Sequence, residues 1–193
     1  MAVTCFYYDF ASREFHTPTN MLGSLVKQLL IGLGEIPGEI VQKFRSQKKA
    51  IGGRKLQLPD LVKMFATVSA SQRTFICVDA FDECLPEHEL EVLHALEQIL
   101  ERSSKVRVFM TGRSHVAAVV GRGLGGRVAS VSIKPRDGDI VTYLRTRLRN
   151  DTTPGAMDNF LENDIMTTIS GDKSETYVVA WYPLSLCNSY SNR

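Results

Sequence analysis

The sequence predicts an α/β protein built on a doubly wound, mostly parallel β-sheet, in which helices cover both faces of the sheet. Runs of β-branched and aromatic residues alternate with longer stretches in which apolar residues recur at helical spacing. The run at residues 74–78 is continuously hydrophobic and does not alternate, as expected of a strand covered on both faces. A chain of 193 residues is long enough for one compact domain and too short to suggest two.

Four strands are expected along the chain. The first covers residues 2–8, whose side chains are mostly β-branched or aromatic. A run of continuous hydrophobicity predicts the second strand at residues 74–78, which are followed by Asp79, and a further buried strand is expected at residues 106–110. A fourth strand is expected over residues 128–133.

Helices are expected between these strands. Thr17 and Pro18 supply a cap and a first-turn proline, and apolar residues then recur at helical spacing until Gly32. A further helix begins at Pro86, and its predicted inner face carries Leu90, Leu93, Leu96 and Leu100. Other helices are expected around residues 40–44, 61–68, 137–149 and 158–169, with Ile140, Tyr143, Leu144 and Leu148 on the inner face of the third.

Composition and charge exclude several classes of function. Lys and Arg number 23 against 21 for Asp and Glu, and no basic block occurs, so we expect no nucleic-acid partner and no anionic membrane surface. No apolar stretch approaches the length of a spanning helix. The four cysteines form no Cys-x-x-Cys pair, which favours reduced thiols. We therefore expect a cytoplasmic globular protein.

A cluster of carboxylates follows the second predicted strand. Asp79 comes directly after the buried run, and Asp82 and Glu83 follow within the next turn. Ligands of open α/β sheets bind beyond the carboxyl ends of the strands, and Mg²⁺ is commonly held by one or two carboxylates with water and phosphate oxygens. Asp79 is the candidate metal ligand, and Asp82 or Glu83 is a candidate for orienting or deprotonating a water molecule. The alternative is a solvated acidic turn before Pro86.

The next strand also ends in polar residues. Thr111 and Gly112 precede Arg113, and neighbouring parallel strands would bring Arg113 to the same sheet edge as Asp79. An arginine at such an edge suits a phosphate contact, while the alternative is an ordinary ion pair between arginine and aspartate.

Five runs of the sequence, taken together, resemble a known family. They are residues 6–10, 21–29, 75–84, 108–113 and 139–144. The likeness is to the NACHT-type NTPases of the STAND class, particularly fungal proteins with a nephrocystin-3-like N-terminal region. Its most specific part is a Walker B-like run followed by a sensor-like run, at residues 75–84 and 108–113.

The resemblance implies a fold, a site and an activity. It implies a P-loop NTPase sheet over residues 1–170, with Asp79 binding Mg²⁺ through water and Arg113 sensing a γ-phosphate. It implies Asp82 and Glu83 as the acidic pair of the catalytic site, and ATP or GTP as the bound nucleotide. Such proteins act as nucleotide-driven switches, and family members often carry ankyrin, WD40 or TPR repeats.

The sequence also departs from this family. No Gly-Lys pair occurs in it, so we expect the Walker A phosphate loop and its strand to be missing. The family's strand order places that strand between the Arg113 strand and the last strand, which predicts a sheet with a central gap. We expect residues 171–193 to be a divergent C-terminal tail.

Three functions remain open. The first is a partial nucleoside-triphosphatase switch domain that binds and hydrolyses ATP or GTP poorly by itself, because the phosphate-binding amides are missing. The alternative is a non-catalytic interaction or regulatory fragment that associates with a full-length, loop-bearing NACHT relative, or with itself, through exposed sheet edges. A metal-dependent phosphohydrolase without a phosphate loop would use the same carboxylates.

Overall fold

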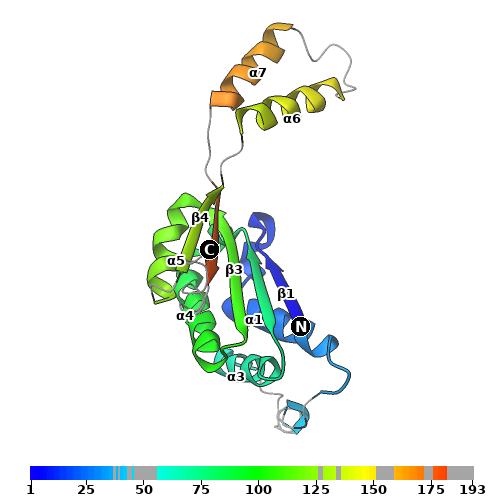
Figure 1. Ribbon diagram of the computed structural model, residues 1–193, viewed down its shortest axis with the longest axis vertical. Helices are drawn as coiled ribbons and strands as arrows, with labels where there is room; N and C mark the ends of the chain where they lie inside the picture. Colours follow the sequence, from blue (N-terminus) through cyan, green and yellow to red (C-terminus); the bar gives the residue numbers. More distant parts are fainter. Residues whose placement is uncertain are drawn as a thin grey trace, which may run out of the picture. The chain divides into compact units, whose positions relative to one another are not determined.

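The computed structural model describes residues 1–36, 38, 40–42, 45, 56–125, 128–133, 136–150, 159–171 and 176–181. The chain divides into two compact units (Figure 1). Unit 1 consists of Met1–Val131 with Tyr177–Arg193, and unit 2 consists of Ser132–Thr176. Strands and helices alternate along unit 1, so the predicted α/β class is confirmed.

The sheet is built on three parallel strands close to their predicted places. They are β1 (Ala2–Tyr7), β2 (Thr74–Asp79) and β3 (Val106–Arg113), and β2 pairs with both neighbours. Two further strands, β4 (Val128–Ile133) and β5 (Thr176–Trp181), extend the order to β1-β2-β3-β5-β4.

The predicted central gap is wrong, because β5 lies in the sheet between β3 and β4. The six residues of β5 are threonine, tyrosine, valine, valine, alanine and tryptophan, a composition that favours an extended strand. Part of the predicted divergent tail, residues 171–193, is therefore a sheet strand, while residues 182–193 lie outside the described part of the chain.

Helices follow most of the strands. In unit 1 they are α1 (Pro18–Ile31), α3 (Leu58–Ser69), α4 (Pro86–Arg102) and α5 (Ala117–Gly123). Unit 2 contains α6 (Asp137–Arg149) and α7 (Asn159–Gly171), which contact each other. Outside residues 38–45, the described part of unit 1 also contains three short 3-10 helices. They are Phe10–Phe15, Phe81–Glu83 and Ser114–Val116. The helix expected around residues 40–44 lies partly outside the described residues.

The start of α1 agrees with the predicted cap. The Thr17 side chain accepts a hydrogen bond from the Asn20 backbone amide at 3.2 Å, and Pro18 occupies the first turn. This arrangement satisfies an amide that has no partner within the helix, and it uses a position where proline costs no hydrogen bond.

One face of the sheet forms the core. Its strands bury alternate residues, and α1, α3 and α4 contact one another as they cover them. The most deeply buried side chains come from both layers: Leu22, Leu25, Phe65, Ile76, Val78, Leu93, Leu96, Ile99, Val106 and Val108. Burial of this apolar surface is the main stabilising contribution to the fold.

The other face of the three strands is less covered. Val3 is 55% exposed and Tyr7 is 66% exposed, while Phe75, Cys77 and Phe109 are half-buried. Successive side chains of a strand point to opposite faces, so these residues line the face away from the core. In the described part of unit 1 this second face is partly open, and helices on both faces of the sheet remain a prediction.

Two residues expected on inner helix faces are exposed. Leu90 is 67% exposed, because the buried stripe of α4 runs through Val92, Leu93 and Leu96 and leaves Leu90 on the outer side of the helix. Tyr143 of α6 is 66% exposed, whereas the adjacent Leu144 is buried. The predicted inner faces of α4 and α6 therefore each include a residue that the structure leaves exposed.

A glutamine of α1 occupies the outer edge of β1. The Gln28 side chain accepts a hydrogen bond from the Cys5 amide at 2.8 Å and donates one to the Cys5 carbonyl at 2.8 Å. The even-numbered positions along this segment face β2 instead, since the amides of Ala2 and Tyr8 donate to the carbonyls of Arg73 and Asp79 at 2.8 and 3.0 Å. Gln28 therefore pairs with backbone groups that a further strand would otherwise use.

None of the described helices is long and apolar enough to cross a membrane.

We predict that Gln28→Met lowers the free energy of unfolding by about 1–3 kcal/mol, because it leaves the peptide groups of Cys5 without their two partners. Urea denaturation followed by circular dichroism measures the change. Gln98→Met in α4 is the matched control, because the Gln98 side chain makes no hydrogen bond with the described residues. Equal effects of the two substitutions would contradict the assigned role of Gln28.

Candidate functional site

The candidate site begins where β2 and β3 end side by side. The strands pair in parallel up to Val78 and Met110, so the next polar residue of each strand lies at the same sheet edge. Here the Thr111 hydroxyl donates a hydrogen bond to Asp79 Oδ1. The same Thr111 oxygen accepts a hydrogen bond from the Ala80 amide at 3.0 Å. Thr111 thus fixes both the Asp79 carboxylate and the start of the following turn.

The turn after Asp79 reverses the chain within a few residues. Ala80 has φ 53° and ψ 47°, a left-handed conformation that is uncommon for a residue with a Cβ. The turn continues as a 3-10 helix over Phe81–Glu83, and the Phe81 side chain is fully buried. The buried ring anchors the turn, and the two acidic residues that follow it are held at the sheet edge.

Asp82 is held against the end of β3. Its carboxylate accepts a hydrogen bond from the Arg113 backbone amide at 3.3 Å and forms an ion pair with Arg113 Nε at 3.3 Å. The Asp82 side chain is only 9% exposed, whereas that of Arg113 is 72% exposed. Asp82 is therefore a structural anchor for Arg113, whose guanidinium group faces solvent.

The close approach of the two turns requires a glycine between Thr111 and Arg113. A Cβ on Gly112 would lie 2.8 Å from Val116 Cγ2 and 3.5 Å from both the Asp82 amide nitrogen and Asp82 Oδ1. A side chain at this position would clash with Val116, so the turn that follows β3 would have to shift. Gly112 thus allows the turn that carries Arg113 to keep its position beside Asp82.

Glu83 lines a cleft beside this edge. The cleft has a volume of about 500 Å³. Side chains of both charges line it: Phe10, Arg13, Asp82, Glu83, Cys84, Pro86, Glu89, Arg113 and His115. Asp79 is not among these lining residues and is connected to the cleft through the turn that follows it. The structure therefore brings Asp82, Glu83 and Arg113 together and places Asp79 next to them.

Two groups of this region, the half-buried Glu89 and the buried Cys84, have raised pKa values. Burial raises the pKa of Glu89, and the charge of His115 opposes this shift. Burial also raises the pKa of the Cys84 thiol to about 11, with smaller contributions from the charges of Glu89 and Glu87. A thiol with such a pKa stays protonated at neutral pH, so Cys84 is not a suitable nucleophile.

The residues present fit a magnesium ion better than a metal held by many protein ligands. Asp79 Oδ2 accepts no hydrogen bond from the described residues, and the Asp79 side chain is exposed. Among the residues that the structure describes, no three His, Cys, Asp or Glu side chains are grouped to hold a metal. A single carboxylate with water and phosphate oxygens is a common way to bind Mg²⁺.

The sequence pattern indicates the charged residues of the site but not the residues that hold them in place. It indicates only a polar strand end at Thr111, yet Thr111 forms the direct contact with Asp79. The parallel register could have revealed this contact, because it places the residue after Met110 beside the residue after Val78. Arg13, Glu89 and His115 come from other elements, and no local pattern indicated that they would line the cleft.

We predict that Thr111→Val lowers the free energy of unfolding by about 1–3 kcal/mol, because the Ala80 amide and the Asp79 carboxylate both lose a partner. Urea denaturation measures this loss. Thr67→Val on the exposed side of α3 is the control, and we expect it to change stability by less than about 0.5 kcal/mol. A stability unchanged by Thr111→Val would show that the hydroxyl does not organise the turn.

A comparison with protein families gives one match, to the family described as Nephrocystin 3, N-terminal, over residues 1–113. The matched part includes β1, β2, β3 and all four candidate residues, Asp79, Asp82, Glu83 and Arg113. No curated protein and no solved structure matches the chain. Because the matched residues make up more than half of the sequence, the chain belongs to the nephrocystin 3 N-terminal family.

Proposed function

We propose that this chain is a nucleotide-binding switch domain of the P-loop NTPase type, related to NACHT domains, and that it carries the magnesium-facing part of the nucleotide site. One observation supports this proposal above all. Thr111 holds Asp79 at the carboxyl edge of the parallel strands, and the exposed guanidinium group of Arg113 lies at the end of the same strand as Thr111. In open α/β sheets this edge is the usual place for ligands.

Each residue has a definite part in the proposed site. Asp79 would bind Mg²⁺ through water, and the bound ion would supply positive charge that screens the phosphate oxygens. Arg113 would reach a terminal phosphate with its outer N–H groups, since Asp82 holds its Nε.

The two remaining carboxylates differ in their suitability for proton transfer. Asp82 is occupied by two contacts with Arg113. Glu83 lines the cleft and is half-buried, so it is the better candidate for orienting a water molecule.

The absence of a Gly-Lys pair limits what these residues do by themselves. Backbone amides and the lysine of a phosphate loop supply much of the binding energy for a triphosphate. We therefore propose that the 193-residue chain binds Mg²⁺-ATP or Mg²⁺-GTP weakly and does not hydrolyse either at a measurable rate. Nucleotide turnover would require the missing contacts from another segment or another chain.

We predict a dissociation constant for Mg²⁺-ATP on the order of 1 mM or weaker, because carboxylates and one arginine replace a complete phosphate cradle. Paramagnetic broadening by Mn²⁺-ATP in NMR spectra locates the site. We expect broadening at residues 79–83 and 111–113, lost in Asp79→Asn and kept in Glu101→Gln, which changes an exposed glutamate of α4.

Two results would overturn this proposal. Broadening that survives Asp79→Asn would remove Asp79 from the metal site. Micromolar binding, or ATP turnover that Asp79→Ala abolishes, would contradict the proposed weakness of the isolated site.

A second function, association with a copy of the chain or with a loop-bearing relative, is supported by the open face of β1, β2 and β3. Val3 and Tyr7 are exposed on this face, and Phe75 and Phe109 are half-buried, with their ring centroids 6.0 Å apart. Contiguous exposed apolar surface of this kind is characteristic of interaction sites. We propose that copies associate through this face and not through the outer edge of β1, which Gln28 occupies.

We predict that the chain sediments as a dimer or larger species at tens of micromolar, and that Tyr7→Lys shifts it to monomer by placing a charge on the buried surface of the complex. Analytical ultracentrifugation measures the change. Tyr143→Lys is a matched control, because Tyr143 and Tyr7 are both 66% exposed. A monomer at every concentration, or equal effects of both lysines, would refute association through this face.

A further inference from the structure

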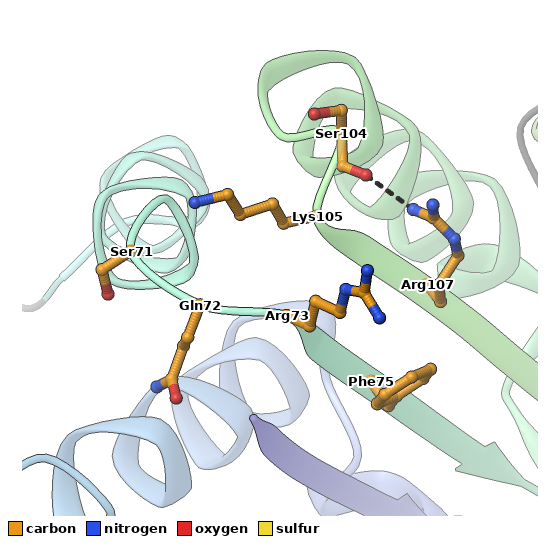
Figure 2. A pocket seen from close by; sticks show the side chains of 7 residues that line it. All are labelled: Ser71, Gln72, Arg73, Phe75, Ser104, Lys105 and Arg107. Carbon is orange, nitrogen blue, oxygen red and sulfur yellow. Dashed lines mark hydrogen bonds between the residues drawn. The ribbon is translucent and has the colours of Figure 1, made fainter.

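A second hollow lies at the opposite ends of the same strands. It has a volume of about 730 Å³, within the range of small-molecule sites. Residues at the amino ends of β2 and β3 line it: Ser71, Gln72, Arg73, Phe75, Ser104, Lys105 and Arg107 (Figure 2). Three of these side chains are cationic, and no carboxylate is among the lining residues. The hollow therefore has the opposite charge from the acidic edge where β2 ends.

Strand register brings the basic residues together. Phe75 and Arg107 are direct partners in the pairing of β2 with β3. Arg73 precedes Phe75 by two residues, and the Thr74 amide donates to the Lys105 carbonyl at 3.0 Å. Figure 2 shows Arg73 extending toward Arg107, whose guanidinium group turns away from Phe75 toward Ser104. Two neighbouring strand ends thus present three cations to one hollow.

Two of the cations are fixed by backbone carbonyls. Lys105 Nζ donates to the Ala70 carbonyl at 2.7 Å. Arg107 Nη1 donates to the carbonyls of Ser104 and Val106, each at 2.7 Å. The neutral Ala70 carbonyl holds Lys105 in place without cancelling its charge. Little further ordering of the two side chains is needed when an anion binds.

The third cation completes the arrangement. The Arg73 side chain is exposed and makes no hydrogen bond or ion pair with the described residues. Its guanidinium group offers the paired N–H donors that match phosphate oxygens. Like charges gathered in one hollow repel one another, and a multiply charged anion would relieve that repulsion. The Phe75 ring gives an apolar surface for the rest of such a ligand.

We propose that this hollow binds small phosphate-bearing anions, with Arg73, Lys105 and Arg107 contacting the phosphate oxygens. The site is separate from the acidic edge and needs no metal ion. It is independent of the proposed nucleotide function, since neither Asp79 nor Arg113 lines it.

Isothermal titration of the whole chain with inorganic pyrophosphate, in EDTA and at constant ionic strength, tests the proposal. We expect saturable binding with a dissociation constant near or below about 0.1 mM, and a loss of roughly tenfold or more in Arg73→Gln. Arg122→Gln, which removes an exposed charge outside the hollow, should bind as the unsubstituted chain does. Asp79→Asn should also leave this binding unchanged.

The Arg73 variant keeps the test decisive, because this side chain has no partner among the described residues whose loss would unfold the protein. NMR shifts on adding pyrophosphate should concentrate at residues 71–75 and 104–107. Absence of saturable binding by the folded chain, or an equal loss in Arg122→Gln, would overturn the proposal. Citrate binding as tightly as pyrophosphate would overturn the assignment to phosphate.

Discussion

Burial of one face of β1, β2 and β3 beneath three helices is the constraint from which the other features follow. Ile76, Val78 and Val108 can face the core only if their strands pair in a single register, because a shift by one residue would turn them toward solvent. The register in turn decides which residues meet at each end of the strands. The acidic and basic ends of β2 and β3 are thus consequences of packing in the middle of the sheet.

Much of unit 1 could be predicted from local pattern. Short runs rich in apolar residues located β2 and β3, and the Thr17 cap with Pro18 located the start of α1. The placement of Asp79 and Arg113 at one edge followed from parallel pairing alone. These features depend on neighbours in sequence or on one simple rule of sheet geometry, so a single sequence contained enough information.

Other features depend on contacts that no local pattern reveals. The apolar run of β2 predicts burial on both faces, yet Phe75 and Cys77 lie on the open face. The hydrophobicity of a residue does not reveal whether another element covers its side chain. The position of β5 between β3 and β4 is a pairing between segments far apart in the chain. The ion pair of Asp82 with Arg113 is another such feature, because the sequence does not indicate which of the nearby carboxylates the arginine contacts.

The amide of Gln28 has a further consequence for the way the sheet ends. By presenting one donor and one acceptor to Cys5, it imitates the peptide group of an adjoining strand. An incoming polypeptide that tried to lengthen the sheet from this border would first have to break both bonds and displace the side chain. A single glutamine of a helix therefore opposes the addition of further strands at this border of the sheet.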